Sequence, residues 1–298
     1  MSTVDDFWTG PTLPIDGGLA TELERRGHDL GDSLWSARIL ADQPDEIRGV
    51  HRAYLDAGAR VVVTASYQVS REGFVAAGRT AAQADEALAM SIELARDTVA
   101  DRDALVAASV GPYGAILHDG SEYRGRYGVS HDRLVHFHGE RLAVMVAARP
   151  DLLAIETIPD LDEVSAIVEV LADFSDVPAW LTMSCADGAH TSAGQRIEDL
   201  VALVADTPSI RAVGVNCTAP EHVESLLQSL SEAGASALVA YPNSGRAWSP
   251  TAGWSGEGTD VGGDLVAQWR RVPGMALIGG CCGVGPEAIA AIAGSLRD

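Results

Sequence analysis

Two adjacent cysteines lie between glycines near the end of the sequence, in the segment IGGCCGVGPEA at residues 278–288. The chain contains four cysteines in all, and neighbouring cysteines are poorly placed to build a disulfide scaffold. Thiolates are ligands that favour zinc over magnesium or calcium. Cys281 and Cys282 therefore suggest a site for a soft metal ion, although the pair alone is also compatible with two packed thiols.

The charge and composition of the chain exclude several kinds of protein. Its 42 acidic and 21 basic side chains give a net charge of −21, which disfavours contact with nucleic-acid phosphates. Every basic residue is arginine, so mechanisms that need a Schiff-base or P-loop lysine are unavailable. No apolar run approaches the roughly 18 residues of a membrane span, and the acidic N-terminus lacks a secretion signal. We therefore expect a cytoplasmic protein with reduced thiols, binding neither nucleic acid nor membrane.

Short apolar runs alternate with amphipathic helical patterns along the whole chain. The runs, typical of parallel strands buried on both faces, occupy residues 13–18, 60–66, 104–111, 152–157, 178–185, 211–217, 237–245 and 276–282. The helical patterns occupy residues 44–58, 80–100, 131–148, 161–174, 197–205, 219–234, 263–270 and 286–296. This alternation predicts the α/β class, a single (β/α)8 TIM barrel with residues 1–298 as one domain.

An open doubly wound sheet is the competing architecture. It would require a glycine-rich phosphate turn after the first strand, but that segment has Gly17 and Gly18 without a third glycine in position. The barrel is therefore the better prediction. Residues 244–260, rich in glycine, serine and tryptophan, are long for a connection after a strand, and we expect a lid or a surface excursion there.

Catalytic side chains of a barrel come from the carboxyl ends of its strands. Most apolar runs end in polar or sulfur-bearing residues: Asp16, Tyr67, Glu156, Thr157, Ser184, Cys185, Asn216, Cys217, Tyr241, Asn243, Cys281 and Cys282. Cys217, Cys281 and Cys282 should therefore share one mouth, where glycines beside the pair permit an irregular backbone. Three thiolates with an open fourth position are the pattern of a catalytic zinc site.

Structural explanations exist for some of these residues. Cys217 could be a small buried hydrophobic residue, with the adjacent pair incidental. We expect Cys185 to pack in the core, and Asn216 and Asn243 could simply tie strand ends together.

A zinc ion held by three thiolates activates water less well than one held by three histidines. It is better suited to hold a fourth sulfur as a thiolate, because coordination deprotonates a thiol whose free pKa is about 8.5. The negative charge of the centre keeps that sulfur nucleophilic. The predicted chemistry is alkyl transfer onto a substrate thiol.

Seven motifs, in order along nearly the whole chain, resemble the homocysteine S-methyltransferase family. They are DGGLATELERRG (16–27), DSLWSARIL (32–40), ASYQVSREGF (65–74), IETIPDLDE (155–163), GVNCTAP (214–220), YPNSG (241–245) and GGCCGVGPE (279–287). The resemblance implies a zinc-dependent barrel that methylates homocysteine to methionine, with Cys217, Cys281 and Cys282 as Zn2+ ligands. It also implies that Asp16 and Glu156 hold the ammonium group of the amino acid.

The motifs SLWSARIL, SYQ and YPNSG look more like family members that use S-methylmethionine or S-adenosylmethionine than betaine-using ones. The resemblance thus implies a sulfonium methyl donor, with S-methylmethionine the first choice and no obligate protein partner. Aromatic faces attract such cations, so Trp35, Tyr67 and Tyr241 are the candidate donor contacts.

Two alternative functions are a zinc-dependent barrel hydrolase and a non-catalytic zinc- or thiol-binding protein. The segment HFH at 136–138 resembles the paired histidines of barrel hydrolases. It falls inside a helical pattern, where residues two apart point to different sides. We therefore expect His136 and His138 to be solvated helix residues.

Overall fold

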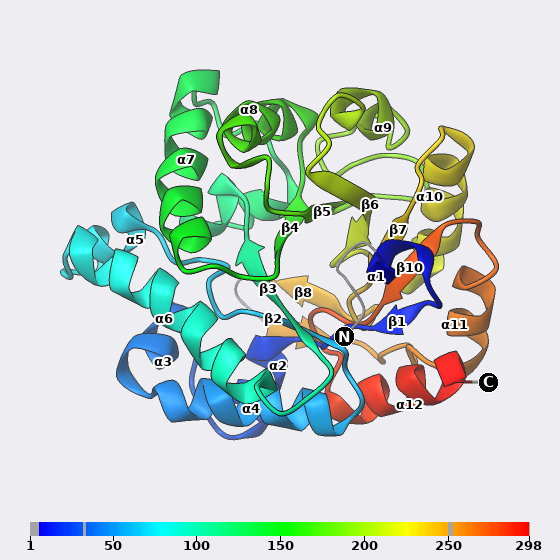
Figure 1. Ribbon diagram of the computed structural model, residues 1–298, viewed down its shortest axis with the longest axis horizontal. Helices are drawn as coiled ribbons and strands as arrows, with labels where there is room; N and C mark the ends of the chain where they lie inside the picture. Colours follow the sequence, from blue (N-terminus) through cyan, green and yellow to red (C-terminus); the bar gives the residue numbers. More distant parts are fainter. Residues whose placement is uncertain (1–5, 32–33, 250–252, 298) are drawn as a thin grey trace.

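Eight parallel strands form the centre of the computed structural model, which describes residues 6–31, 34–249 and 253–297 (Figure 1). They are β1 (Leu13–Pro14), β2 (Val61–Val63), β3 (Leu105–Val110), β4 (Leu152–Ile158), β5 (Ala179–Met183), β6 (Ile210–Asn216), β7 (Leu238–Tyr241) and β10 (Met275–Ile278). Their order is β1-β10-β7-β6-β5-β4-β3-β2. A parallel bridge between Ile15 and Val61 joins the two end strands, so the sheet closes and the predicted (β/α)8 barrel is confirmed.

Helices surround the strands, as Figure 1 shows. Those predicted between strands are α4 (Pro44–Asp56), α6 (Ala81–Val99), α7 (His131–Ala147), α8 (Leu161–Leu171), α9 (Asp199–Val204), α10 (Pro220–Glu232), α11 (Gly263–Trp269) and α12 (Pro286–Arg297). Short helices missed by the prediction are α1 (Asp6–Thr9), α2 (Leu19–Arg25), α3 (Ser36–Asp42) and α5 (Arg71–Ala76). No helix in the described ranges combines the length and the apolar character needed to cross a membrane.

Two apolar layers hold the barrel together. Small and branched side chains fill its interior around Trp180, and Phe7 and Trp8 of α1 pack against this interior cluster. A larger cluster lies between the strands and the helices. Between β7 and α11, the segment predicted as a lid or surface excursion contains an antiparallel hairpin, β8 (Ala247–Ser249) and β9 (Gly253–Ser255). Residues 250–252 lie outside the described ranges.

The two histidines of HFH lie on different sides of α7. His136 is exposed, as predicted, with 68% of its side chain accessible. The prediction for His138 is wrong, because its side chain is fully buried and its Nε2 lies 2.9 Å from Oε1 of Glu163 on α8. The spacing separated the two faces correctly but did not reveal that one face of α7 packs on a buried carboxylate.

The closed barrel leaves no room for a side chain at Gly214 of β6. A Cβ atom there would lie 1.8 Å from the carbonyl oxygen of Val239 on the paired strand β7. We expect Gly214→Ala to lower the free energy of unfolding by about 2–4 kcal/mol, measured by denaturant titration. The control is Gly139→Ala in α7, where Val170 lies at 4.0 Å and alanine should stabilise the helix by about 0.5–1 kcal/mol. Equal effects of the two changes would contradict this account.

Candidate metal and substrate site

Three sulfur atoms meet at the carboxyl ends of β6 and β10. The Sγ atoms of Cys217, Cys281 and Cys282 all lie within 4.8 Å of one another, and those of Cys281 and Cys282 are 4.0 Å apart. Zinc–thiolate bonds of about 2.3 Å in a tetrahedron separate sulfurs by about 3.8 Å. The three thiols therefore fit around one ion with small adjustments, and Cys281 and Cys282 are half-buried, facing the cavity described below.

Hydrogen bonds among the three thiols shift their pKa values. Hydrogen bonds from Cys281 and Cys282 hold the pKa of the Cys217 thiol well below its ordinary value, despite its burial. Contact with Cys217 raises the pKa of Cys281 and of Cys282. The protonation states of the three thiols therefore depend on one another.

Glycines bend the chain so that adjacent cysteines can face one point. β10 ends at Ile278, and a Cβ atom on Gly280 would lie 2.1 Å from Cγ1 of Val284. Gly283 has φ +79°, a conformation that L-residues rarely adopt. The amide of Cys281 donates to the carbonyl of Pro242 at 2.7 Å, which anchors the bend to the end of β7.

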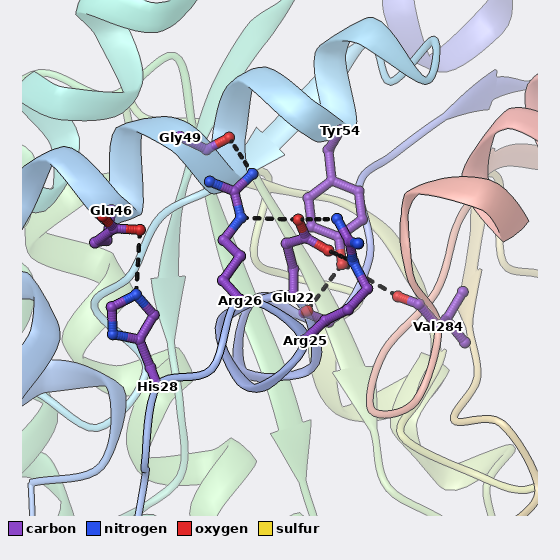
Figure 2. Close-up of polar contacts among 9 residues, drawn as sticks. Glu22, Arg25, Arg26, His28, Glu46, Gly49, Tyr54 and Val284 are labelled. Atoms are coloured by element: carbon purple, nitrogen blue, oxygen red, sulfur yellow. Dashed lines mark hydrogen bonds and ion pairs between the residues drawn. The ribbon is translucent and has the colours of Figure 1, made fainter.

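The dithiol loop, residues 279–285, contacts the segment after β1 and Tyr54 of α4; Figure 2 shows the Tyr54 hydroxyl beside the Val284 carbonyl. The Tyr54 hydroxyl lies 2.8 Å from the carbonyl oxygen of Gly18 and 3.2 Å from that of Val284. The amide of Gly18 donates to the Val284 carbonyl at 3.0 Å, and the amide of Gly283 donates to the Thr21 hydroxyl at 2.8 Å. The DGG segment and the cysteine pair are thus one packed unit.

An ion-pair cluster fixes the helix that follows the DGG segment. The carboxylate of Glu22, fully buried, accepts from Nε of Arg25 at 2.6 Å and from Nε of Arg26 at 2.8 Å. Arg26 also donates to the carbonyl of Gly49 on α4 at 2.9 Å, so α2 is held against α4 (Figure 2). The site therefore rests on a rigid support rather than on a free loop.

Two buried carboxyl groups lie in the same mouth as the thiols. Oδ2 of Asp16 accepts from the amide of Val63 at 2.8 Å, and Oε1 of Glu156 accepts from the Ser109 hydroxyl. Burial raises the pKa of Glu156 to about 7 and raises that of Asp16 well above its usual value, with the nearby Glu156 adding to the shift. Such raised pKa values are common at functional sites.

A buried polar network lies beneath Glu156. Trp180 Nε1 donates to the Tyr241 hydroxyl at 3.0 Å, and that hydroxyl lies 2.8 Å from Oγ1 of Thr182. A hydrogen bond from Tyr241 also lowers the pKa of Glu156, partly offsetting its burial. Tyr241, expected to contact the donor, therefore has its hydroxyl directed into the barrel.

A cavity of about 590 Å³ opens over the thiols. The predicted site residues Asp16, Trp35, Tyr67, Glu156, Tyr241, Cys217, Cys281 and Cys282 all line it. Asp16, Glu24, Asp29, Glu122 and Glu156 place carboxyl groups on its wall, and none of the described lining residues is arginine. The structure thus brings the predicted residues together in a cavity suited to cations.

Tyr123 is a cavity residue that sequence reasoning missed. Its hydroxyl lies 3.2 Å from Sγ of Cys217, and it comes from a 3-10 helix, Ser121–Tyr123, between β3 and α7. That connection, residues 111–130, is long for a strand-to-helix loop, and such length was the available signal of function.

One buried arginine fixes both loops beside the cavity. Arg141 of α7 donates to the carbonyls of Tyr67 at 2.8 Å, Val69 at 2.9 Å and Gly111 at 2.8 Å. Its planar fork of donors suits several carbonyls at once, and so the loops after β2 and β3 are held at a fixed separation.

The fourth cysteine is separate from the cluster. Cys185 packs against the core, as expected, and burial raises the pKa of its thiol to about 12. It stays a neutral thiol that does not join the other three.

Comparison with known proteins agrees with this geometry. The family model for homocysteine S-methyltransferase matches residues 13–296. Homocysteine S-methyltransferase YbgG of Bacillus subtilis (strain 168) is 41% identical over 97% of this chain and 96% of its own length. Homocysteine S-methyltransferase of Escherichia coli (strain K12) is 43% identical over 94% of each chain.

Solved structures show the same relationship. The metallated form of the homocysteine methyltransferase MmuM from Escherichia coli has a TM-score of 0.87 and 41% identity, covering 97% of each chain. The oxidized form of that protein has a TM-score of 0.85 over 96% of each chain. With the family model spanning nearly its whole length, this chain belongs to the homocysteine S-methyltransferase family.

Proposed function

We propose that this protein transfers a methyl group from a sulfonium donor to the sulfur of homocysteine, giving methionine, at a zinc ion held by three thiolates. One observation carries the proposal: three thiols converge on the floor of a cavity that also contains two buried carboxyl groups. Family membership over residues 13–296 supports the acceptor and the reaction class. The catalytic unit is the whole barrel, and we infer that residues 1–298 form one domain.

The donor set suits zinc. Three soft thiol ligands, with Cys281 and Cys282 facing the cavity, leave a fourth position toward the substrate. Zinc bound there would act as a Lewis acid that keeps the acceptor sulfur deprotonated. Cys217 would be the buried ligand of the ion, and Cys281 and Cys282 of the dithiol loop would be the ligands on the side that faces the cavity.

The chain's own residues bind and orient the two substrates. Asp16 and Glu156 are proposed to pair with the ammonium group of homocysteine, while Ser109 and Tyr241 orient Glu156. The acceptor thiolate uses a lone pair to form a bond to the donor methyl. The bond between that methyl and the donor sulfur breaks at the same time, and the electron pair of the broken bond stays on the donor sulfur. Opposite charges disappear in this step, so the residues mainly align the partners and exclude water.

The cavity wall favours a cationic donor. Trp35 and Tyr67 are proposed to present aromatic faces to the sulfonium, each worth roughly 0.5–2 kcal/mol. Tyr241 is proposed to complete the donor side with its ring while its hydroxyl supports Glu156. Carboxyl groups without arginine on the described wall give a negative environment, which suits S-methylmethionine first and S-adenosylmethionine second.

The HFH segment does not support the hydrolase alternative. His136 is exposed on α7, and His138 is buried against Glu163 rather than at the thiols. A non-catalytic zinc- or thiol-binding protein would form no methionine from homocysteine and a sulfonium donor, so measuring methionine formation distinguishes this role from the proposal.

Replacing the buried ligand tests the metal scheme. We expect Cys217→Ser to lower kcat/KM by at least about 100-fold and to reduce bound zinc from about one ion per chain. Elemental analysis and a methionine-formation assay measure the two effects. Cys185→Ser is the matched control and should change neither, and full activity of Cys217→Ser would rule out the metal scheme.

Replacing the ammonium-binding carboxylate tests the acceptor site. Because burial raises the pKa of Glu156 to about 7, the folded metal-free protein holds a proton that the unfolded chain has already released, and its stability falls as pH rises through 4.5 to 7. We expect Glu156→Gln to be more stable than wild type at pH 8, by on the order of 2 kcal/mol, with the difference vanishing near pH 4.

The same variant should bind homocysteine less well. We expect its KM for homocysteine to rise about 10- to 100-fold, because an amide cannot neutralise the ammonium group. Thermal unfolding at both pH values and steady-state kinetics measure these effects. Glu86→Gln, an exposed site on α6, should alter neither, and an unchanged homocysteine KM in Glu156→Gln would remove Glu156 from the acceptor site.

Donor choice is tested by parallel kinetics. We expect kcat/KM to be highest with S-methylmethionine, then S-adenosylmethionine, and at least about tenfold lower with betaine, because an amine leaves less readily than a thioether. Trp35→Leu should raise the KM of the sulfonium donor while Trp35→Phe, which keeps an aromatic face, should raise it less. A higher rate with betaine would contradict the proposed donor class.

A further inference from the structure

Two strand ends at the site have a backbone conformation that their residues rarely adopt. Thr157, directly after Glu156, has φ +60°, and Cys217 has φ +47°. Positive φ is a true outlier for a β-branched residue such as threonine. Such conformations persist only where the surroundings impose them, and they cluster at functional sites.

The side chain of Asn216 lies between these two strand ends. Its Oδ1 accepts the amide of Thr157 at 2.6 Å, and its Nδ2 donates to the Thr157 hydroxyl at 2.7 Å. Oδ1 also accepts from the Thr182 hydroxyl at 2.8 Å. Asn216 is fully buried, and this double contact specifies the left-handed conformation of Thr157.

A second asparagine contacts the other strand end, at Cys217. Nδ2 of Asn243 donates to the carbonyl of Cys217 at 3.1 Å. The sequence contains only these two asparagines, and both lie at the ends of strands beside the thiols. Both asparagines tie strand ends together, which confirms that expectation. Their partners differ, because the side chain of Asn216 bonds to Thr157 and that of Asn243 bonds to Cys217.

We propose that Asn216 is a positioning residue that sets the distance between the thiol of Cys217 and the carboxyl group of Glu156. Asn216 is the last residue of β6 and directly precedes Cys217. Its side chain bonds to Thr157, which directly follows Glu156 in β4. One homocysteine must reach both groups at once, its sulfur near the thiols and its ammonium near Glu156. This inference rests on the proposed function. It adds that Asn216 links the binding point for the acceptor sulfur to the binding point for the ammonium group.

The test separates the metal end from the carboxylate end. Co2+ bound to thiolates gives a charge-transfer absorption band, and titrating metal-free protein with Co2+ alone reports the affinity of the thiols. Calorimetric titration of zinc-loaded protein with homocysteine, without donor, reports both ends together. The same titration with methionine, which has the ammonium group but no free thiol, reports the carboxylate end. Variants are Asn216→Ala, Asn243→Ala, and Asn216→Ala combined with Thr157→Gly.

Asn216→Ala should weaken both measurements, Co2+ affinity by about 10- to 100-fold and homocysteine affinity by about tenfold. Asn243→Ala should weaken Co2+ affinity without weakening the ammonium contact. The affinity of this variant for methionine, which lacks a free thiol, should therefore equal that of wild type. Glycine accepts positive φ without support. Adding Thr157→Gly to Asn216→Ala should therefore restore homocysteine affinity to within about threefold of the Asn243→Ala value while Co2+ affinity stays low.

Other outcomes would overturn the inference. An Asn216→Ala protein that melts lower but keeps both affinities would show that the clamp only stabilises the fold. If that variant does not fold, Thr157→Val, which removes the contacts of the hydroxyl with Asn216 and Tyr67 and keeps the branched shape, must weaken homocysteine binding more than Co2+ binding, or the inference fails. Wild-type protein without a Co2+ charge-transfer band would instead refute the proposed metal function, a separate result.

Discussion

The convergence of three thiols on one point is the constraint on which the rest of this structure depends. Sulfurs within 4.8 Å of one another repel once ionised, so the chain must hold them there by other contacts. The barrel does this by placing Cys217 at the end of β6 and bending the chain after β10. Backbone hydrogen bonds to Pro242 and Asp16 carbonyls fix the bend, and Tyr54 supports it from behind.

The carboxyl groups show a second compromise between folding and binding. Asp16 and Glu156 are buried with raised pKa values, an arrangement that costs stability until a cation enters. Their partners are few and neutral: an amide at Asp16, two hydroxyl groups at Glu156. The carboxyl groups are thus held in place by hydrogen bonds before a ligand arrives, which reduces the reorganisation needed when a cationic group enters.

Sequence patterns predicted the barrel, its eight strands and the residues at their carboxyl ends, because apolar runs and strand-end chemistry are local properties. They missed Tyr123, since nothing periodic in residues 111–130 indicates that the chain returns to Cys217. They placed His138 in solvent, because helical spacing does not tell which face meets Glu163. The bonds of Asn216 to Thr157 also depend on side-chain direction across strands 59 residues apart, which no local pattern encodes.

Barrel closure has a consequence for synthesis of the protein. β1 pairs with β10, so Leu13 lies beside Leu277, and the segment at Gly18 rests on the loop at Val284. Both β1 and the segment that follows β10 must therefore have left the ribosome before the cysteine cluster exists. A nascent chain lacking β10 presents Cys217 alone, so the addition of this strand completes both the sheet and the three-thiol cluster.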